Sequence, residues 1–97
     1  MSSQTKIVKS PYFKSRLREI LHFIALDSKK RAKGFKNSLY RTIKTIVDMP
    51  YKHRKSIYFD NENIRDLIYK GYTVIYEIDE KNNRIVIMGI KKYRENI

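Results

Sequence analysis

The last third of the sequence constrains the fold most strongly, because it reads as three strands joined by two tight turns. Residues 64–93 are rich in β-branched and aromatic side chains, and Lys70-Gly71 and Asn82-Asn83 are typical turn sequences. In the last two predicted strands, apolar side chains fall on both faces. A strand of this kind is usually central in its sheet and covered. The sheet therefore needs an amphipathic layer, which the first half of the chain must supply.

The first half predicts a short strand and a helix. Residues 6–9 form the strand candidate, and Ser10-Pro11 is a helix start with Ser at the N-cap and Pro at the first helical position. From there to about residue 25, the apolar side chains recur on one helical stripe. The stripe consists of Phe13, Leu17, Ile20, Leu21 and Ile24.

A second helix is expected from Lys29 to about Val47, after Asp27-Ser28 has broken the pattern and supplied another N-cap. It repeats the helical period with Ala32, Phe35, Leu39, Ile43 and Ile46. Asp48-Met49-Pro50 ends it, because proline disfavours the helical conformation of the residue before it. The connection between the helices is short, which predicts an antiparallel hairpin.

These elements predict a single α+β domain over residues 1–97, with the order β-α-α-β-β-β. An antiparallel helical hairpin, at about 11–48, is expected to pack on one face of a small, mainly antiparallel sheet with its core at about 64–93. The other face is expected to be partly open and basic. Residues 51–63 give no clear prediction.

Composition limits the function classes. Twenty-two Lys and Arg residues face ten Asp and Glu residues, and the formal charge is +12. Such a surface attracts polyanions or acidic proteins, although a merely solvated surface is the plainer interpretation. There is no cysteine, and neither histidine has a partner at metal-ligand spacing, so we expect no metal and no cofactor. The start lacks a signal-like apolar region and the apolar runs are far shorter than ~18 residues, which predicts a cytoplasmic protein without a membrane span.

An ordered set of local features resembles the RelE/ParE toxin superfamily of type II toxin–antitoxin modules, from about Lys6 to Arg94. The set comprises Ser10-Pro11, Met49-Pro50, Arg65-x-Leu67, Gly71-Tyr72-x-Val74-Ile75-Tyr76 and a last apolar strand that runs into basic residues. The spacing is closer to ParE-like and plasmid-stabilisation toxins than to RelE. The resemblance implies a cytotoxic protein that is neutralised by a cognate antitoxin. ParE-like members inhibit DNA gyrase, whereas RelE-like members cleave mRNA on the ribosome.

The resemblance also separates these two activities. Metal-free RNA cleavage needs a base, an acid and cations around the phosphate. The position of an important RelE-like arginine corresponds to Thr73, and those of two RelE lysines to Ile64 and Asp66. These residues argue against a nuclease. If the protein is a nuclease, the candidates for catalysis lie in the tail, whose plainer interpretation is a solvated strand end. They are Lys91, Lys92, Tyr93 and Arg94.

Two further groups of residues are candidates for binding. Arg65, His53 and Arg54 could contact phosphate or an acidic target. For Arg65, pairing within the fold with Asp66, Glu62 or Glu77 is slightly favoured over this role, and His53 is more simply a surface histidine without a role. The second helix has a long run of cations that suits an acidic antitoxin but is also typical of a solvated face. From it and the nearby tyrosines we expect antitoxin contacts at Lys29, Lys33, Lys36, Tyr40 and Tyr72.

The preferred hypothesis is a non-enzymatic, ParE-like toxin that binds DNA gyrase and is neutralised by its antitoxin. The alternative is a RelE-like, ribosome-dependent mRNA endonuclease. A basic RNA-binding module without toxicity is the third possibility. A neighbouring reading frame for a small acidic protein would favour a toxin over this module.

Overall fold

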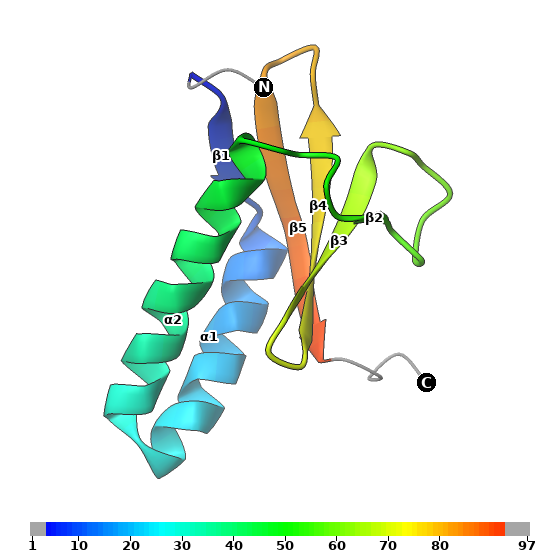
Figure 1. Cartoon of the computed structure of the whole chain (residues 1–97). Helices are drawn as coiled ribbons and strands as arrows, with labels where there is room; N and C mark the ends of the chain where they lie inside the picture. The colour runs from blue at the N-terminus through cyan, green and yellow to red at the C-terminus, as the bar shows by residue number, and fades with distance from the viewer. Residues whose placement is uncertain (1–3, 93–97) are drawn as a thin grey trace.

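A helical hairpin covers one face of a five-stranded sheet in the computed structural model, which describes residues 4–92 (Figure 1). The elements in chain order are β1 (Lys6–Lys9), α1 (Pro11–Asp27), α2 (Lys29–Lys44), the 3₁₀ helix η1 (Thr45–Val47), β2 (Arg54–Lys55), β3 (Ile64–Tyr69), β4 (Tyr72–Asp79) and β5 (Arg84–Lys92). The strand order is β1-β5-β4-β3-β2; β1 runs parallel to β5, and the other pairs are antiparallel. The predicted fold class is confirmed, with β2 as an additional strand in the region that the sequence left open.

Two serines define the helical hairpin, as the sequence predicts. Ser10 Oγ accepts the backbone N–H of Phe13 at 3.1 Å and starts α1. Ser28 accepts the N–H of Arg31 at 3.1 Å through its side chain, while its own N–H donates to the carbonyl of Ile24. One residue thus closes α1 and opens α2, so the helices must reverse direction there. The helix α1 continues to Asp27, two residues beyond the predicted end.

The turns predicted between the last three strands are also present. Lys70 and Gly71 both have positive φ, at 45° and 83°, as a two-residue hairpin of the type favoured by the twist of the strands requires. Asn83 has φ of 51° in the second turn. The first turn places Tyr69 opposite Tyr72, and this register directs alternate side chains of β3 and β4 toward the helices.

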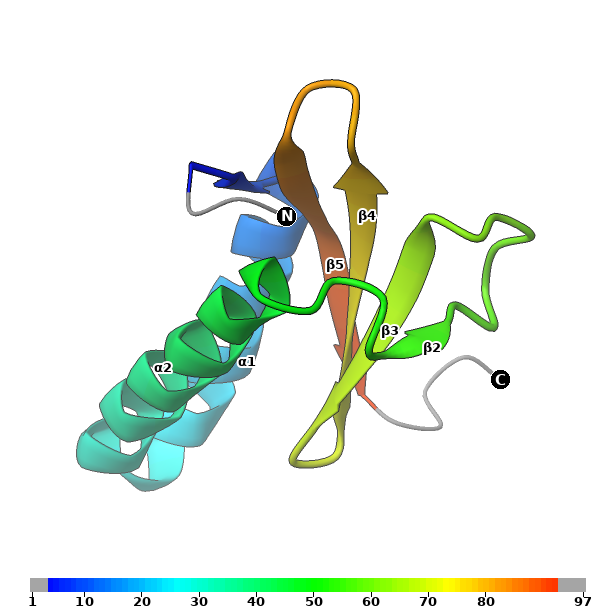
Figure 2. The same ribbon diagram turned by 45° about the horizontal axis from the view of Figure 1, so that its top comes forward.

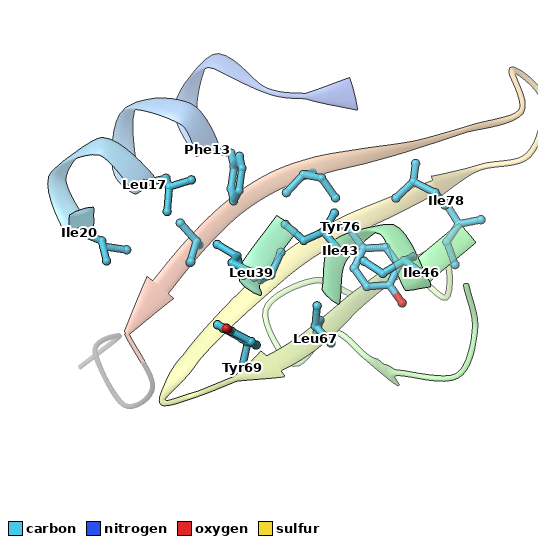
Figure 3. Close-up of a cluster of buried hydrophobic side chains, with 14 residues drawn as sticks. Phe13, Leu17, Ile20, Leu39, Ile43, Ile46, Leu67, Tyr69, Tyr76 and Ile78 are labelled. Atoms are coloured by element: carbon cyan, nitrogen blue, oxygen red, sulfur yellow. The ribbon is translucent and has the colours of Figure 1, made fainter. Parts of the chain in front are cut away.

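The core lies between the hairpin and the sheet (Figure 3). Buried apolar side chains from both helices meet those of β3, β4 and β5. They are Phe13, Leu17, Ile20, Leu39, Ile43, Ile46, Leu67, Tyr69, Val74, Tyr76, Ile78, Ile85, Ile87 and Ile90. The stripes predicted for the two helices therefore supply most of the helical side of the core, although Leu21, Ile24 and Phe35 are only partly buried.

The face of the sheet away from the helices is closed at its centre, so at most its periphery is open as expected. Thr73, Ile75 and Asp66 belong to that face, and all three are buried. The segment that follows β2 closes over part of it, because the N–H of Ile57 donates to Asp66 Oδ2 at 3.1 Å. The link between β2 and β3 projects on the side of the sheet away from the helices (Figure 2). Within residues 4–92, no helix is long and apolar enough to span a membrane.

Candidate functional site

Arg65 of β3 forms hydrogen bonds to the backbone of the segment between η1 and β3. Its Nε donates to the carbonyl of Glu62 at 2.9 Å, and one terminal nitrogen donates to the carbonyl of His53 at 3.1 Å. The guanidinium also lies over the ring of Tyr51, 5.0 Å from its centre. Only 15% of the side chain is exposed. These contacts use the donors that a phosphate would need, so the geometry favours the structural interpretation of Arg65 over target binding.

The side chain of His53 packs against the sheet. Its ring meets that of Tyr76 edge to face, with 6.1 Å between the ring centres. Partial burial, and to a smaller extent the charge of Lys52, lower the pKa of His53 below its ordinary value. The imidazole is therefore neutral where a phosphate-binding cation would have to be charged. Within residues 4–92, His, Asp and Glu side chains form no group that could hold a metal ion.

Arg54 lies beside a buried acid. One terminal nitrogen is 3.4 Å from Oδ2 of Asp66, the residue that it faces across the β2–β3 pair. The carboxylate is fully buried, whereas about two fifths of the Arg54 side chain is exposed. Arg54 therefore keeps surface for a partner, while Asp66 holds β2 and the following segment against the sheet. The other carboxylate oxygen, Oδ1, has no hydrogen-bond partner among the described residues.

The two described lysines of the tail point to opposite faces of the sheet. Lys91 pairs with Thr73 on the face away from the helices, and its ammonium group lies 4.2 Å from the centre of the Tyr58 ring. Lys92 pairs with Tyr72, and its ammonium group lies over the ring of Phe23 in α1. Successive residues of a strand diverge in this way. The pair does not form one catalytic group, and Tyr93 and Arg94 lie outside the described residues.

The three sheet positions that correspond to RelE-like cations are closed to a substrate. Thr73 is fully buried, Asp66 is almost so, and Ile64, the first residue of β3, has 7% of its surface exposed. None is a cation. Buried side chains without a positive charge cannot stabilise a phosphate at these positions.

The residues expected to bind the antitoxin lie on α2 and on the adjoining start of β4. Lys29 and Lys33 are exposed on α2, whereas Lys36 and Lys9 both lie against the ring of Tyr40. Tyr72 is on the sheet and packs edge to face on Phe35, with 5.4 Å between the ring centres. Lys29, Lys33, Lys36 and Tyr40 follow one another at helical spacing along α2, and Tyr72 adjoins that helix through Phe35.

An apolar surface at the end of the hairpin was missed. Phe23 and Leu26 of α1 are both largely exposed, and with Ile24, Asp27, Arg31 and Tyr72 they line a hollow of about 460 Å³. Asp27 and Arg31 form an ion pair with each other. The signal was present in the sequence, because Phe23 and Leu26 are large apolar residues outside the stripe predicted for this helix. Exposed apolar residues beside cations suit a partner that is both apolar and acidic.

Comparisons with known proteins agree with this architecture. A family model described as "ParE toxin of type II toxin-antitoxin system, parDE" matches residues 7–97. A solved structure titled "Chromosomal ParDE TA system from P. aeruginosa" contains a chain that superposes with a TM-score of 0.72. The similarity covers 94% of this chain and 98% of that chain, at 13% sequence identity. A search of curated protein sequences finds no match.

Proposed function

Since the chain belongs to the ParE toxin family of type II toxin–antitoxin systems, we propose that it stops growth by binding DNA gyrase as a protein inhibitor. The observation that supports this proposal most strongly is the burial of Ile64, Asp66 and Thr73. A nuclease of the RelE type would need exposed cations at these positions to stabilise the phosphate. The separation of Lys91 from Lys92 on opposite faces adds to the argument against RNA cleavage.

A member of this family acts together with a cognate antitoxin. We propose that the antitoxin covers the end of the helical hairpin around Phe23 and Leu26. The cations Lys29 and Lys33 follow on the adjoining start of α2, where Arg31 is paired with Asp27. An amphipathic segment with acidic residues on one side and apolar residues on the other would satisfy both parts of this surface. The sequence-based choice of Lys29 and Lys33 is thereby retained, with Phe23 and Leu26 as the apolar anchors.

Induction of the chain in a gyrase-proficient bacterium tests the proposed target. A DNA-damage reporter and the 5′ ends of ribosome-bound mRNA are followed in the same culture. We expect filamentation and a DNA-damage response while transcripts remain intact. Rapid arrest of translation with cuts at regular codon positions would instead establish the nuclease alternative. Normal growth would contradict toxicity in that host and favour the RNA-binding module.

A further inference from the structure

The link between β2 and β3 combines two properties that rarely occur together, since it is tightly held and yet exposes large apolar side chains. Ile57 is 65% exposed and Phe59 is 42% exposed, and Ile68 on the neighbouring strand β3 is 45% exposed. Loops are normally polar on their outer side. Large apolar groups exposed close together along a chain commonly mark a surface that binds another protein.

The backbone N–H groups at the start of the link, residues 56–58, are all hydrogen-bonded. Ser56 donates its N–H to the carbonyl of Ile64 at 2.8 Å, and its hydroxyl accepts the N–H of Tyr58 at 3.1 Å. Asp66 accepts the N–H of Ile57 from within the sheet. These bonds fix the backbone of residues 56–58 from the side of the sheet.

The far end of the link is fixed as well. The carbonyl of Asn61 accepts the N–H of Ile64 at 3.1 Å, and the Asn61 side chain accepts the N–H of Asn63 at 2.8 Å. The hydroxyl of Tyr51 donates to the side chain of Asn63 at 3.0 Å. A link that is ordered in this way loses little conformational entropy when it binds, so its exposed side chains can act as preorganised anchors.

The direction of the side chains alternates along the link. Tyr58 turns toward β5, where its ring lies 4.2 Å from the ammonium group of Lys91. Its two neighbours, Ile57 and Phe59, stay exposed. The contact of Tyr58 with Lys91 thus helps to hold Ile57 and Phe59 in their exposed positions.

The low net charge around the link favours one kind of partner over another. Residues 51–63 contain Lys52, Arg54 and Lys55 against Asp60 and Glu62, so they carry a formal charge near +1 in a chain of +12. A polyanion or an acidic antitoxin is attracted more strongly to the remaining surface, which carries most of the positive charge. Even with the ammonium group of Lys91 on Tyr58, this surface is only weakly basic. Together with its apolar anchors, it suits a protein with a complementary apolar recess.

We infer that Ile57 and Phe59 are the anchors by which this toxin docks on its protein target. The inference rests on the proposed function, because that target is gyrase. The inference gives the molecule two separate binding surfaces. The antitoxin binds the basic end of the hairpin, and the target binds the link on the opposite side of the sheet (Figure 2).

Gyrase-catalysed supercoiling of relaxed plasmid DNA, titrated with purified toxin, tests this inference. The double variant Ile57→Ala/Phe59→Ala should require about tenfold more protein or greater for half-inhibition, as expected when hot-spot side chains are truncated. The matched control, Val8→Ala/Tyr12→Ala, removes an aliphatic and an aromatic side chain that are also exposed. It should inhibit like the unmodified chain.

Thermal melting and antitoxin binding of both variants establish that they are folded. If the double variant melts early, Ile57→Glu changes only the more exposed anchor and is used in its place. Equal inhibition by the variant and the unmodified chain would overturn the inference and leave the proposed function standing. Failure of the unmodified chain to inhibit gyrase would overturn both.

Discussion

The hydroxyl of Tyr76 donates a hydrogen bond to the carbonyl of Pro50, 2.5 Å away. Tyr76 is a fully buried residue of the central strand β4, and Pro50 lies where the helical hairpin has just ended. Burial, as the largest cause, raises the pKa of this hydroxyl well above its usual range, so the group remains a donor throughout the physiological range. The bond therefore anchors the start of the connector on the sheet that the hairpin covers.

Replacement of Tyr76 by Phe should lower the free energy of unfolding by about 1–3 kcal/mol, because the carbonyl of Pro50 loses its partner in a buried place. Urea denaturation measures the change. Tyr12→Phe is the matched control, since Tyr12 is largely exposed and should change stability by less than about 0.5 kcal/mol. Equal stability of the two variants would show that the bond contributes nothing.

Two leucines of the hairpin should respond very differently to truncation. Leu39 is fully buried between α2 and the sheet, whereas 74% of Leu26 is exposed. Leu39→Ala should cost about 2–5 kcal/mol through the lost core and the remaining cavity. Leu26→Ala should stay within about 0.5 kcal/mol of the unmodified chain. Similar melting temperatures for both variants would mean that the helical faces are misassigned.

The stability of the fold should decrease in mild acid because of His53. The pKa of His53 is lowered in the folded state, chiefly by burial, so the unfolded chain binds the proton more readily. Stability is therefore full above pH 6.5 and is lost as the pH falls through the folded-state pKa. Thermal melting at pH 7.5 and 5.5 measures this loss, and His53→Gln should reduce it. A loss of the same size in His53→Gln would contradict this assignment.

Asp66 should be needed to hold the link between β2 and β3. Asp66→Ala removes the acceptor of the Ile57 N–H and the partner of Arg54, and should destabilise the fold by about 1–3 kcal/mol. It should also speed proteolytic cleavage within residues 56–60. Asp60 offers a matched exposed acid, and Asp60→Ala should have little effect on either measurement. Unchanged cleavage in Asp66→Ala would show that the link is held by other contacts.

Association with the antitoxin should slow as salt is added. The proposed surface at the hairpin end is rimmed by cations, and long-range attraction between exposed charges is screened within about 10 Å at 0.1 M salt. Stopped-flow mixing measures the on-rate. Phe23→Ala/Leu26→Ala should mainly raise the dissociation rate and leave the salt dependence intact. An on-rate independent of salt would place the antitoxin on an uncharged surface.

Local sequence signals predicted the parts of this fold that are determined by neighbouring residues. Ser10 and Ser28 cap helices because a side-chain oxygen three residues before an amide can bond to it. Lys70-Gly71 forms a turn because glycine accepts positive φ. Such features need no knowledge of distant segments, and the alternation of apolar residues then orients each strand.

The features that the sequence did not predict depend on contacts between distant residues. Asp66 is an acid in a strand, and nothing local indicates that Arg54 and the backbone of Ile57 bury it. β2 has only two residues, too few for a periodic pattern. For Arg65, the sequence indicated a possible pair with Glu62, which is present, but not the hydrogen bond to the carbonyl of His53, which depends on how the connector folds.

Direct binding of purified toxin to purified gyrase is the measurement that tests the central claim of a protein inhibitor. We expect a saturable complex that forms without RNA and leaves ribosome-bound mRNA uncut. Loss of the complex on truncation of Ile57 and Phe59 would locate the contact at the link. Absence of any complex, together with cleavage of mRNA on ribosomes, would contradict the account and make this chain a nuclease.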